Sequence, residues 1–298
     1  MIIPPKINIG DKIGIVAPAR KITSDLLDPA IDILRSWGLE VVLGSFIFEE
    51  DNQFSGTIHQ RTISFQKMLD DPSINAVLCA RGGYGTVQLI DKIDFTILTE
   101  NPKWIIGYSD ITVLHSHLNK IGLSSLHATM PINFISNSKK SLNSLKKSLF
   151  GHQNIIKFQP HSKNQYGRVN AEIVGGNLSI LYSLLGSNSD VDTDGKILFI
   201  EDLDEYLYHI DRMVISMKRN RKFVNLKAMI IGEMSHMNDN DIPFGKTIEE
   251  IIIEHVKEYN FPLCFGFPCG HLDDNRSLRL GSKSVLEINE NGCILLQN

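Results

Sequence analysis

The first half of the chain alternates short apolar runs with segments whose apolar residues recur at helical spacing. The apolar runs occupy residues 12–17, 40–44, 75–80 and 104–106, and the helix-like segments occupy 24–37 and 59–70. Strands that alternate with helices form a parallel sheet covered on both faces, and ligands bind at the carboxyl ends of such strands. The sequence therefore predicts an α/β domain in which the turns after Ala17, Ala80 and Gly107 meet in one crevice.

The second half contains more short strands and fewer helices. Polar segments at 136–147 and 161–166 interrupt the pattern, so we expect one domain at 1–155 and a second at 165–298. Gly175-Gly176 is interpreted as a turn that leads into a helix from about 177 to 185. Short strands are expected at 196–200, 228–231, 263–265, 285–288 and 293–296. The prediction is a parallel-sheet α/β domain followed by a smaller, β-rich α/β domain.

Composition excludes several classes of protein. Of the 298 residues, 42% are apolar and 21% are charged, which is ordinary for a soluble globular chain. The net charge of −4 gives no electrostatic reason to bind nucleic acid or an anionic membrane. Basic clusters at 139–147 and 218–222 are expected to be solvated helix faces. No run approaches the roughly 18 apolar residues of a membrane span, and the amino terminus lacks the pattern of an export signal.

The cysteines indicate a reducing compartment. They are few and scattered, and most lie in apolar runs: Cys79, Cys264, Cys269 and Cys293. We therefore expect reduced core thiols and a cytoplasmic protein. Cys264, Cys269 and His271 form an incomplete zinc pattern, but zinc would need a fourth ligand and tighter spacing. Neither a metal nor another cofactor is expected.

Ser109 is the leading candidate for a reactive residue. It follows the apolar run 104–106 through Gly107 and Tyr108, and a helix-like pattern comes next. This is the layout of a nucleophile elbow, in which a sharp turn presents a serine hydroxyl at a helix amino terminus. The G-x-S-x-G pattern is incomplete, because Ile111 occupies the position of the second glycine. The segment also fits a serine that only caps the helix, so both interpretations stay open.

In three further segments, groups that could take part in binding or catalysis follow apolar runs. Arg81-Gly82-Gly83 follows the third run, and its glycines allow backbone N–H groups to point at an anion, although glycine pairs also form ordinary turns. Glu201 directly follows an apolar strand, where acids often cap helices or stay on the surface. His271 lies in a polar loop, where most imidazoles are simply solvated.

Together these segments supply a nucleophile, an acid and a base in the order Ser109, Glu201 and His271. A serine hydroxyl becomes a good nucleophile only when a neighbouring base takes its proton, and imidazole suits that task because its pKa is roughly 6.5. A carboxylate orients the ring and stabilises the imidazolium. The three residue types are common, so their spacing alone leaves the triad a hypothesis.

Seven linked motifs make the chain resemble the LD-carboxypeptidases, a family of serine peptidases that includes the microcin-immunity carboxypeptidases. The resemblance extends from about residue 7 to residue 295. The motifs are Val16-Ala17-Pro18, Arg81-Gly82-Gly83-Tyr84-Gly85, Gly107-Tyr108-Ser109-Asp110-Ile111-Thr112, Gly175-Gly176-Asn177-Leu178, Leu198-Phe199-Ile200-Glu201-Asp202, Ile210-Asp211-Arg212-Met213 and Gly270-His271. The chain departs from the family pattern at Ala19-Arg20 and at 126–130, and both departures can reshape the substrate cleft.

The resemblance implies a cytoplasmic serine carboxypeptidase with a Ser-Glu-His triad and no metal. Carried over by motif, Ser109 is the nucleophile, His271 the general base and Glu201 the acid that orients it. The backbone amides of Gly83 and Asp110 are the expected oxyanion donors.

The resemblance also implies a fold, an assembly and a reaction. The fold is a flavodoxin-like or amidotransferase-like parallel-sheet domain joined to a smaller β-rich α/β domain, commonly as a homodimer. The reaction is release of the terminal D-alanine from the murein tetrapeptide, by cleavage after the L-centre of a diamino acid. An exopeptidase must also bind a terminal carboxylate, and Arg81 is the candidate anchor, with a structural ion pair or turn role as the alternative.

Two other functions stay open. A microcin-immunity-type enzyme would act on a peptidyl or aminoacyl nucleotide, and the resemblance implies an added loop with an aromatic residue that stacks on the base. This chain has only Trp37 and Trp104, both in apolar segments. The more distant alternative is a non-catalytic α/β module in which Arg81-Gly82-Gly83 holds an anion and Ser109 only caps a helix.

Overall fold

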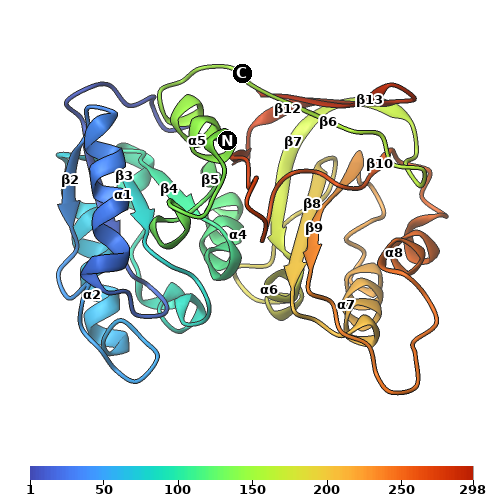
Figure 1. The fold of residues 1–298 in the computed structure, drawn as a ribbon, viewed down its shortest axis with the longest axis horizontal. Coiled ribbons are helices and arrows are strands. Elements are labelled where there is room, and N and C mark those ends of the chain that lie inside the picture. Colours follow the sequence, from blue (N-terminus) through green and yellow to red (C-terminus); the bar gives the residue numbers. More distant parts are fainter. Residues whose placement is uncertain (298) are drawn as a thin grey trace.

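The computed structural model describes residues 1–297 and contains two sheets side by side with helices packed against them (Figure 1). The first sheet has six strands in the order β11-β5-β4-β3-β1-β2. Its strands are β1 (Lys12–Val16), β2 (Glu40–Leu43), β3 (Ile74–Cys79), β4 (Trp104–Gly107), β5 (Ser125–His127) and β11 (Leu278–Leu280). All neighbouring pairs are parallel except β11 with β5. This arrangement confirms the predicted α/β class and the four predicted strands of the first half.

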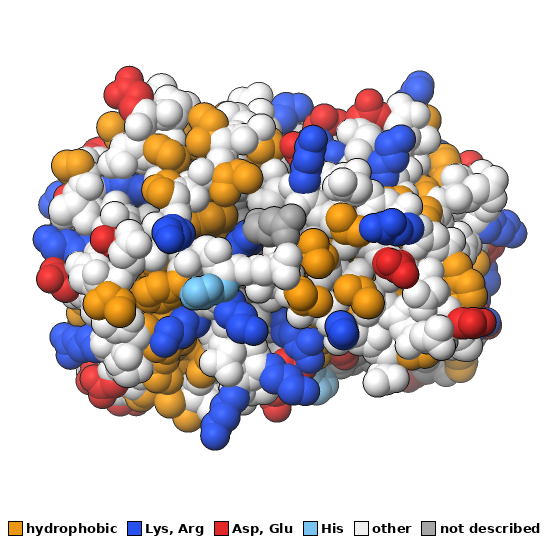
Figure 2. Space-filling model, turned by 90° about the horizontal axis from the view of Figure 1, so that it is seen from above, with side chains coloured by type: hydrophobic (Ala, Val, Ile, Leu, Met, Phe, Trp, Pro, Cys, Tyr) orange, Lys and Arg blue, Asp and Glu red, His pale blue; other side chains and the backbone are white. Residues whose placement is uncertain are grey.

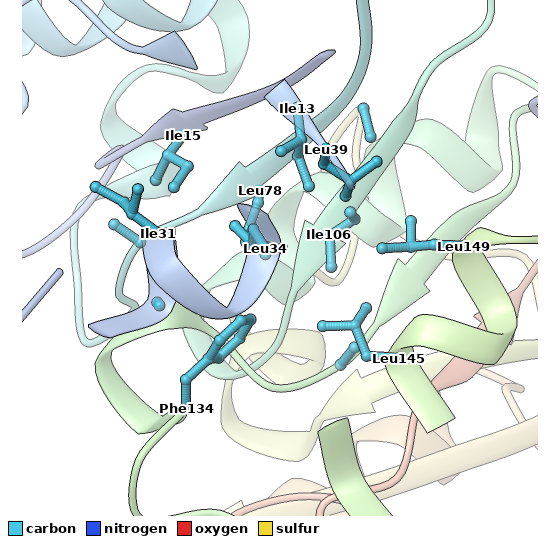
Figure 3. Close-up of a cluster of buried hydrophobic side chains, with 14 of the residues drawn as sticks. Ile13, Ile15, Ile31, Leu34, Leu39, Leu78, Ile106, Phe134, Leu145 and Leu149 are labelled. Atoms are coloured by element: carbon cyan, nitrogen blue, oxygen red, sulfur yellow. The ribbon is translucent and has the colours of Figure 1, made fainter. Parts of the chain in front are cut away.

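Helices cover both faces of the first sheet. Helices α1 (Ser24–Ser36) and α5 (Lys139–Leu149) pack on one face, and α2 (Ile58–Asp70) and α4 (Thr112–Lys120) pack on the other. Successive strand residues point to opposite faces, so Leu78 and Ile106 join the core beneath α1, while Val77 and Ile105 join the core beneath α2. Figure 3 shows the first of these cores, where Leu34 of α1 lies beside Leu78.

Helix α5 lies within a segment that the sequence pattern identified as polar, with a basic cluster expected on a solvated helix face. Ser138 caps it by accepting a hydrogen bond from the Ser141 N–H at 3.1 Å. Leu145 and Leu149 are buried, whereas Lys147 is exposed. Figure 2 shows Lys and Arg side chains at the molecular surface in the view from above. The lysines of α5 thus occupy a solvated helix face, as predicted.

The second sheet has seven strands in the order β10-β9-β8-β7-β12-β13-β6. Its strands are β6 (Asn154–Phe158), β7 (Gly167–Asn177), β8 (Ile197–Leu203), β9 (Ala228–Ser235), β10 (Leu263–Cys264), β12 (Lys283–Asn289) and β13 (Gly292–Gln297). Strands β7 to β10 are parallel, and the β7-β12-β13-β6 part is antiparallel. Helices α6 (Leu178–Ser183), α7 (Leu207–Arg219) and α8 (Ile248–Val256) contribute to one apolar core with β7, β8 and β9.

The interpretation of Gly175-Gly176 as a turn is wrong. Both glycines lie inside β7, where Gly175 pairs with Phe199 and Gly176 with Ile200 of β8. A Cβ atom on Gly175 would lie 1.9 Å from the Phe199 carbonyl oxygen, so the two backbones approach too closely for a side chain. The glycines therefore allow close strand contact within the sheet rather than a change of chain direction.

The two sheets do not divide the chain in strict sequence order. Strand β6 belongs to the second sheet, whereas β11, far downstream, returns to the edge of the first sheet beside β5. The division into 1–155 and 165–298 stays a prediction. The arrowheads of β2, β8 and β9 point to the same lower edge in Figure 1. The carboxyl ends of the parallel strands in both sheets therefore face one edge, where ligands bind in open α/β sheets.

Candidate active site

Ser109 occupies a strained turn between β4 and α4. Its backbone φ is 62°, which is unusual for a residue other than glycine. A short 3-10 helix (Ser109–Ile111) follows directly and leads into α4. Gly107 makes the turn possible, because a Cβ there would lie 2.8 Å from the Ile111 side chain. The strand–turn–helix layout is that expected of a nucleophile elbow, and the Ser109 side chain is partly exposed rather than enclosed in the core.

A buried histidine holds the base of this turn. His115 Nε2 lies 2.9 Å from the Gly107 carbonyl oxygen, which can only accept, so Nε2 carries the proton. His115 Nδ1 then accepts from the Ser125 hydroxyl at 2.8 Å. Burial lowers the pKa of His115 to about 4, which keeps the ring neutral. Sequence reasoning missed this residue, because its role depends on a contact with a neighbouring strand.

The glycine turn after β3 packs directly against Ser109. A Cβ on Gly82 would lie 3.3 Å from the Ser109 Cβ, and Gly83 has a φ of 107°. The Asp110 carboxylate accepts from both the Thr86 N–H at 2.9 Å and the Thr86 hydroxyl at 2.7 Å. Two segments that carry the expected oxyanion donors are therefore tied together by a buried acid, and burial raises the pKa of Asp110 despite these hydrogen bonds.

A buried arginine connects three loops at the same edge. The Arg61 guanidinium donates to the carbonyl oxygens of Pro18 at 2.7 Å, Gly85 at 3.1 Å and Gly56 at 3.2 Å. Burial lowers its pKa, and the Asp110 charge opposes that effect. Arg61 thus fixes the far end of the glycine turn. The helical pattern of α2 gave no sign of this role.

His271 and Glu201 form a hydrogen-bonded pair. His271 Nδ1 lies 2.7 Å from Glu201 Oε2, and the side chains are 14% and 0% exposed. A carboxylate only accepts, so Nδ1 donates and Nε2 is left as the acceptor of the neutral ring. Burial disfavours the imidazolium, but the Glu201 charge and hydrogen bond outweigh it and raise the pKa of His271. The sequence placed Glu201 at a strand end and His271 in a polar loop.

The His271 loop is held from several sides. The Asn275 side chain accepts from the Gly270 N–H at 3.0 Å, and the Ser235 hydroxyl donates to the His271 carbonyl at 2.7 Å. A Cβ on Gly270 would lie 2.9 Å from Glu201, so the close approach of this loop to β8 requires a glycine. Asn275 and Ser235 are further positioning residues that a single sequence does not reveal.

The elbow and the His–Glu pair lie next to each other. The Tyr108 and His271 rings are 4.9 Å apart between centroids, and Tyr108 immediately precedes Ser109. The Ser109 hydroxyl forms no hydrogen bond with residues 1–297, so a Ser109–His271 bond is not made in this structure. Hydrogen bonds of this kind commonly form only once substrate binds.

A second set of contacts near this site joins the first half of the chain to the second half. The Thr112 hydroxyl, at the start of α4, accepts from the Asn177 N–H at 3.0 Å, and Asn177 donates through its side chain to Asp202 at 2.9 Å. Burial and the adjacent Glu201 charge raise the pKa of Asp202 to about 7. A Cβ on Gly176 would lie 2.5 Å from the Thr112 hydroxyl oxygen, so glycine is needed here as well.

Other candidate residues have ordinary structural environments. All four cysteines are buried and free, as predicted. His127, in the segment expected to shape the cleft, is completely buried and contacts the Cys269 Sγ at 3.2 Å through Nδ1.

Within the described part of the chain no group of three or more His, Cys, Asp or Glu side chains could hold a metal ion. No helix among residues 1–297 is long and apolar enough to cross a membrane.

Comparison with known proteins identifies the family. Residues 13–128 match the model of the LD-carboxypeptidase N-terminal domain, and residues 170–286 match that of the C-terminal domain. A probable murein peptide carboxypeptidase of Bacillus subtilis is 30% identical over 98% of this chain and 93% of its own length. The chain belongs to the LD-carboxypeptidase family. This confirms the predicted enzyme class, a serine-type carboxypeptidase, and disfavours the non-catalytic alternative.

Two further relatives bear on the fold and on the choice of substrate. The crystal structure of the muramoyltetrapeptide carboxypeptidase from Oxalobacter formigenes superposes with a TM-score of 0.89 at 26% identity, covering 96% of this chain and 98% of that one. The microcin C7 self-immunity protein MccF of Escherichia coli is 26% identical over 94% of this chain and 91% of its own length. The enzyme thus shares its whole two-sheet fold with the family.

Proposed function

We propose that this LD-carboxypeptidase hydrolyses the L–D peptide bond of murein tetrapeptides and releases the terminal D-alanine. The observation that carries the proposal is the hydrogen bond between His271 and the fully buried Glu201, beside a strained turn that presents Ser109. The names of the Bacillus subtilis and Oxalobacter formigenes relatives support murein peptide as the substrate. We further propose that the enzyme acts in the cytoplasm as a homodimer.

In the proposed reaction Ser109 is the nucleophile. His271 takes the hydroxyl proton through Nε2 as Ser109 attacks the amide carbonyl, while Glu201 holds Nδ1 and stabilises the imidazolium. The backbone N–H groups of Gly83 and Asp110 bind the oxyanion, and donors of this kind are each worth about 3–4 kcal/mol. His271 then gives its proton to the leaving D-alanine amine, and water repeats the sequence on the acyl-enzyme.

The proposal places the substrate at the edge where the glycine turn meets Ser109. Arg81 lies in this turn, and its guanidinium donates to the Lys21 carbonyl at 3.2 Å. It makes no ion pair with an acid among residues 1–297. We retain Arg81 as an anchor for the terminal carboxylate, because guanidinium groups bind carboxylates through paired hydrogen bonds.

The test is incubation of purified protein with tetrapeptides that carry L-lysine or diaminopimelate at the third position. We expect release of D-alanine by the wild type and loss of release in Ser109→Ala, which keeps the backbone and removes only the nucleophile. No release from either peptide, with the wild type and Ser109→Ala behaving alike, would refute the proposal. A serine-directed phosphonate provides an independent check, since only an activated hydroxyl becomes labelled.

The match to MccF favours a second candidate, hydrolysis of a peptidyl or aminoacyl nucleotide, because solved MccF structures contain glutamyl sulfamoyl guanosine or aspartyl sulfamoyl adenosine. Trp104 is buried in β4 and donates to the Pro5 carbonyl, while Trp37 follows the end of α1 and packs against Phe134. Neither tryptophan contacts the Ser109 turn among the ring contacts of residues 1–297, which makes this candidate the weaker one. Comparing kcat/KM for the tetrapeptide and for an aminoacyl sulfamoyl adenylate would separate the two.

A further inference from the structure

We propose that Arg20 binds the free carboxylate of the residue that the enzyme removes, together with Arg81. This inference rests on the proposed carboxypeptidase function and deepens it, because it names the group that makes the enzyme an exopeptidase. Arg20 lies in the loop after β1 and is exposed. The sequence marks Arg20 only as part of a departure from the family pattern that can reshape the substrate cleft.

The Arg20 side chain lies directly across the glycine turn. A Cβ atom on Gly83 would be 2.5 Å from Arg20 Cδ and 2.8 Å from Nε. The backbone N–H of Arg20 donates to the Gly82 carbonyl at 3.4 Å, which fixes the start of the side chain. Gly82 in turn approaches Ser109 closely, since its Cβ would lie 3.3 Å from the Ser109 Cβ. Arg20, the glycine turn and Ser109 are therefore contiguous.

The charge of Arg20 is not neutralised within the described chain. Its guanidinium forms no hydrogen bond or ion pair with residues 1–297, whereas the neighbouring Lys21 pairs with Glu50 at 2.6 Å. Arg81 lies close enough for the Arg20 charge to add to burial in lowering the pKa of Arg81. Two guanidinium groups without an acidic partner repel each other, and a bound anion would relieve that repulsion.

The chemistry of the proposed substrate fits this position. The carboxylate of a terminal amino acid is only three covalent bonds from the carbonyl carbon that Ser109 attacks. An enzyme that removes a single residue therefore needs its cation within a few ångströms of the oxyanion donors. Arg20 crosses Gly83, one of the proposed donors, and so lies at the required place. A guanidinium group there can donate paired hydrogen bonds to both carboxylate oxygens.

The experiment compares the tetrapeptide with its carboxyl-terminal amide in the wild type and in Arg20→Gln. We expect Arg20→Gln to raise KM for the free acid about tenfold to a hundredfold, the effect of losing a charge-assisted hydrogen bond, with a smaller change in kcat. On the amide, Arg20→Gln and the wild type should have the same KM and kcat. Arg20→Lys should recover part of the loss. Lys21→Gln is the matched control, because Lys21 is the adjacent cation and already has an acidic partner.

Binding to the inactive Ser109→Ala protein separates this inference from the proposed function. Calorimetric titration with the acid and the amide should show tighter binding of the acid, and adding Arg20→Gln should reduce the difference to what Arg81 alone provides. If D-alanine is released but Arg20→Gln discriminates acid from amide as the wild type does, the inference is wrong and the function stands. If no D-alanine is released but the Arg20-dependent preference is present, the function is wrong and the carboxylate site stands.

Discussion

The Asp110 carboxylate accepts two hydrogen bonds from Thr86, one from the N–H and one from the hydroxyl. Asp110 directly follows Ser109, and Thr86 follows the glycine turn, so this contact sets the position of one proposed oxyanion donor relative to the other. The acid is buried, which makes the contact costly to break. It explains how two loops from different strands can act as one rigid binding surface.

Replacing Thr86 by valine should therefore reduce kcat more than it changes KM. Thr86→Val keeps the shape and the N–H donor but removes the hydroxyl, so we expect kcat to fall roughly tenfold to a hundredfold as the oxyanion donors lose their spacing. Stability should fall by about 1–3 kcal/mol, because Asp110 loses a buried partner. Thr62→Val in α2 is the control, since its hydroxyl only contacts the Ile58 carbonyl on the surface. Equal kcat values for both variants would contradict this account.

The pair formed by His271 and Glu201 predicts a pH dependence. The proposed reaction needs neutral His271, and Glu201 raises the pKa of this group, so the acidic limb of kcat/KM should have its midpoint above the ordinary imidazole value of roughly 6.5. Glu201→Gln removes the charge that stabilises the imidazolium. The midpoint should move to lower pH, and kcat should fall by a factor on the order of 10³. A pH profile with an unchanged midpoint would show that Glu201 does not act on His271.

His115 should make the fold sensitive to acid. Its pKa is about 4 in the folded protein and roughly 6.5 in the unfolded chain, so the unfolded state binds more protons between these values. The stabilisation by neutral His115 is complete above pH 6.5 and is lost as pH falls to 4. This linkage amounts to about 3 kcal/mol, of which about 2 kcal/mol is lost by pH 5.

The measurement compares the wild type with His115→Gln by urea unfolding at pH 7.5 and pH 5. Glutamine can keep both hydrogen bonds but does not titrate. Asp202 titrates in the opposite sense, because its raised pKa makes stability fall as pH rises from 3.8 towards 7. The informative quantity is therefore the difference between the two proteins, which should shrink by about 2 kcal/mol from pH 7.5 to pH 5. A constant difference would place the His115 pKa near its ordinary value.

The sequence predicted the elements whose signal is local. The strands of the first sheet are short apolar runs. Glu201 follows such a run and His271 lies in a polar loop, and the family motifs gave both residues a role in one triad hypothesis. The contacts of His115, Arg61 and Asn275 could not be predicted. Arg61 donates to the distant Pro18 carbonyl, while His115 and Asn275 contact Gly107 and Gly270 across turns whose geometry the sequence does not show. Periodicity shows which face of an element is buried, but it does not show which loop carbonyl lies opposite a given side chain.

The error at Gly175-Gly176 has a related cause. Adjacent glycines are most often found in turns, and a single sequence gives no sign that another strand approaches closely. In the structure the absence of both Cβ atoms lets β7 lie against Phe199 on one side and Thr112 on the other. At the level of sequence, the pair Gly175-Gly176 thus fits either a turn or a close contact between strands. Only the tertiary contacts distinguish a glycine that bends the chain from one that makes room for a neighbour.

Gly270 provides a test of such close packing at the candidate active site. Its φ is 122°, and a Cβ would lie 2.9 Å from Glu201, so Gly270→Ala should displace the His271 loop from its acid. We expect kcat to fall more than about tenfold and stability to fall by more than the about 1–2 kcal/mol of a strained φ. Gly266→Ala is a matched control, because Gly266 also has a positive φ of 73° but no atom within 4 Å of the added Cβ. Gly266→Ala should lose only the stability that a strained backbone φ costs, and it should keep the wild-type kcat. If both variants lose activity equally, backbone strain rather than contact with Glu201 determines the position of His271.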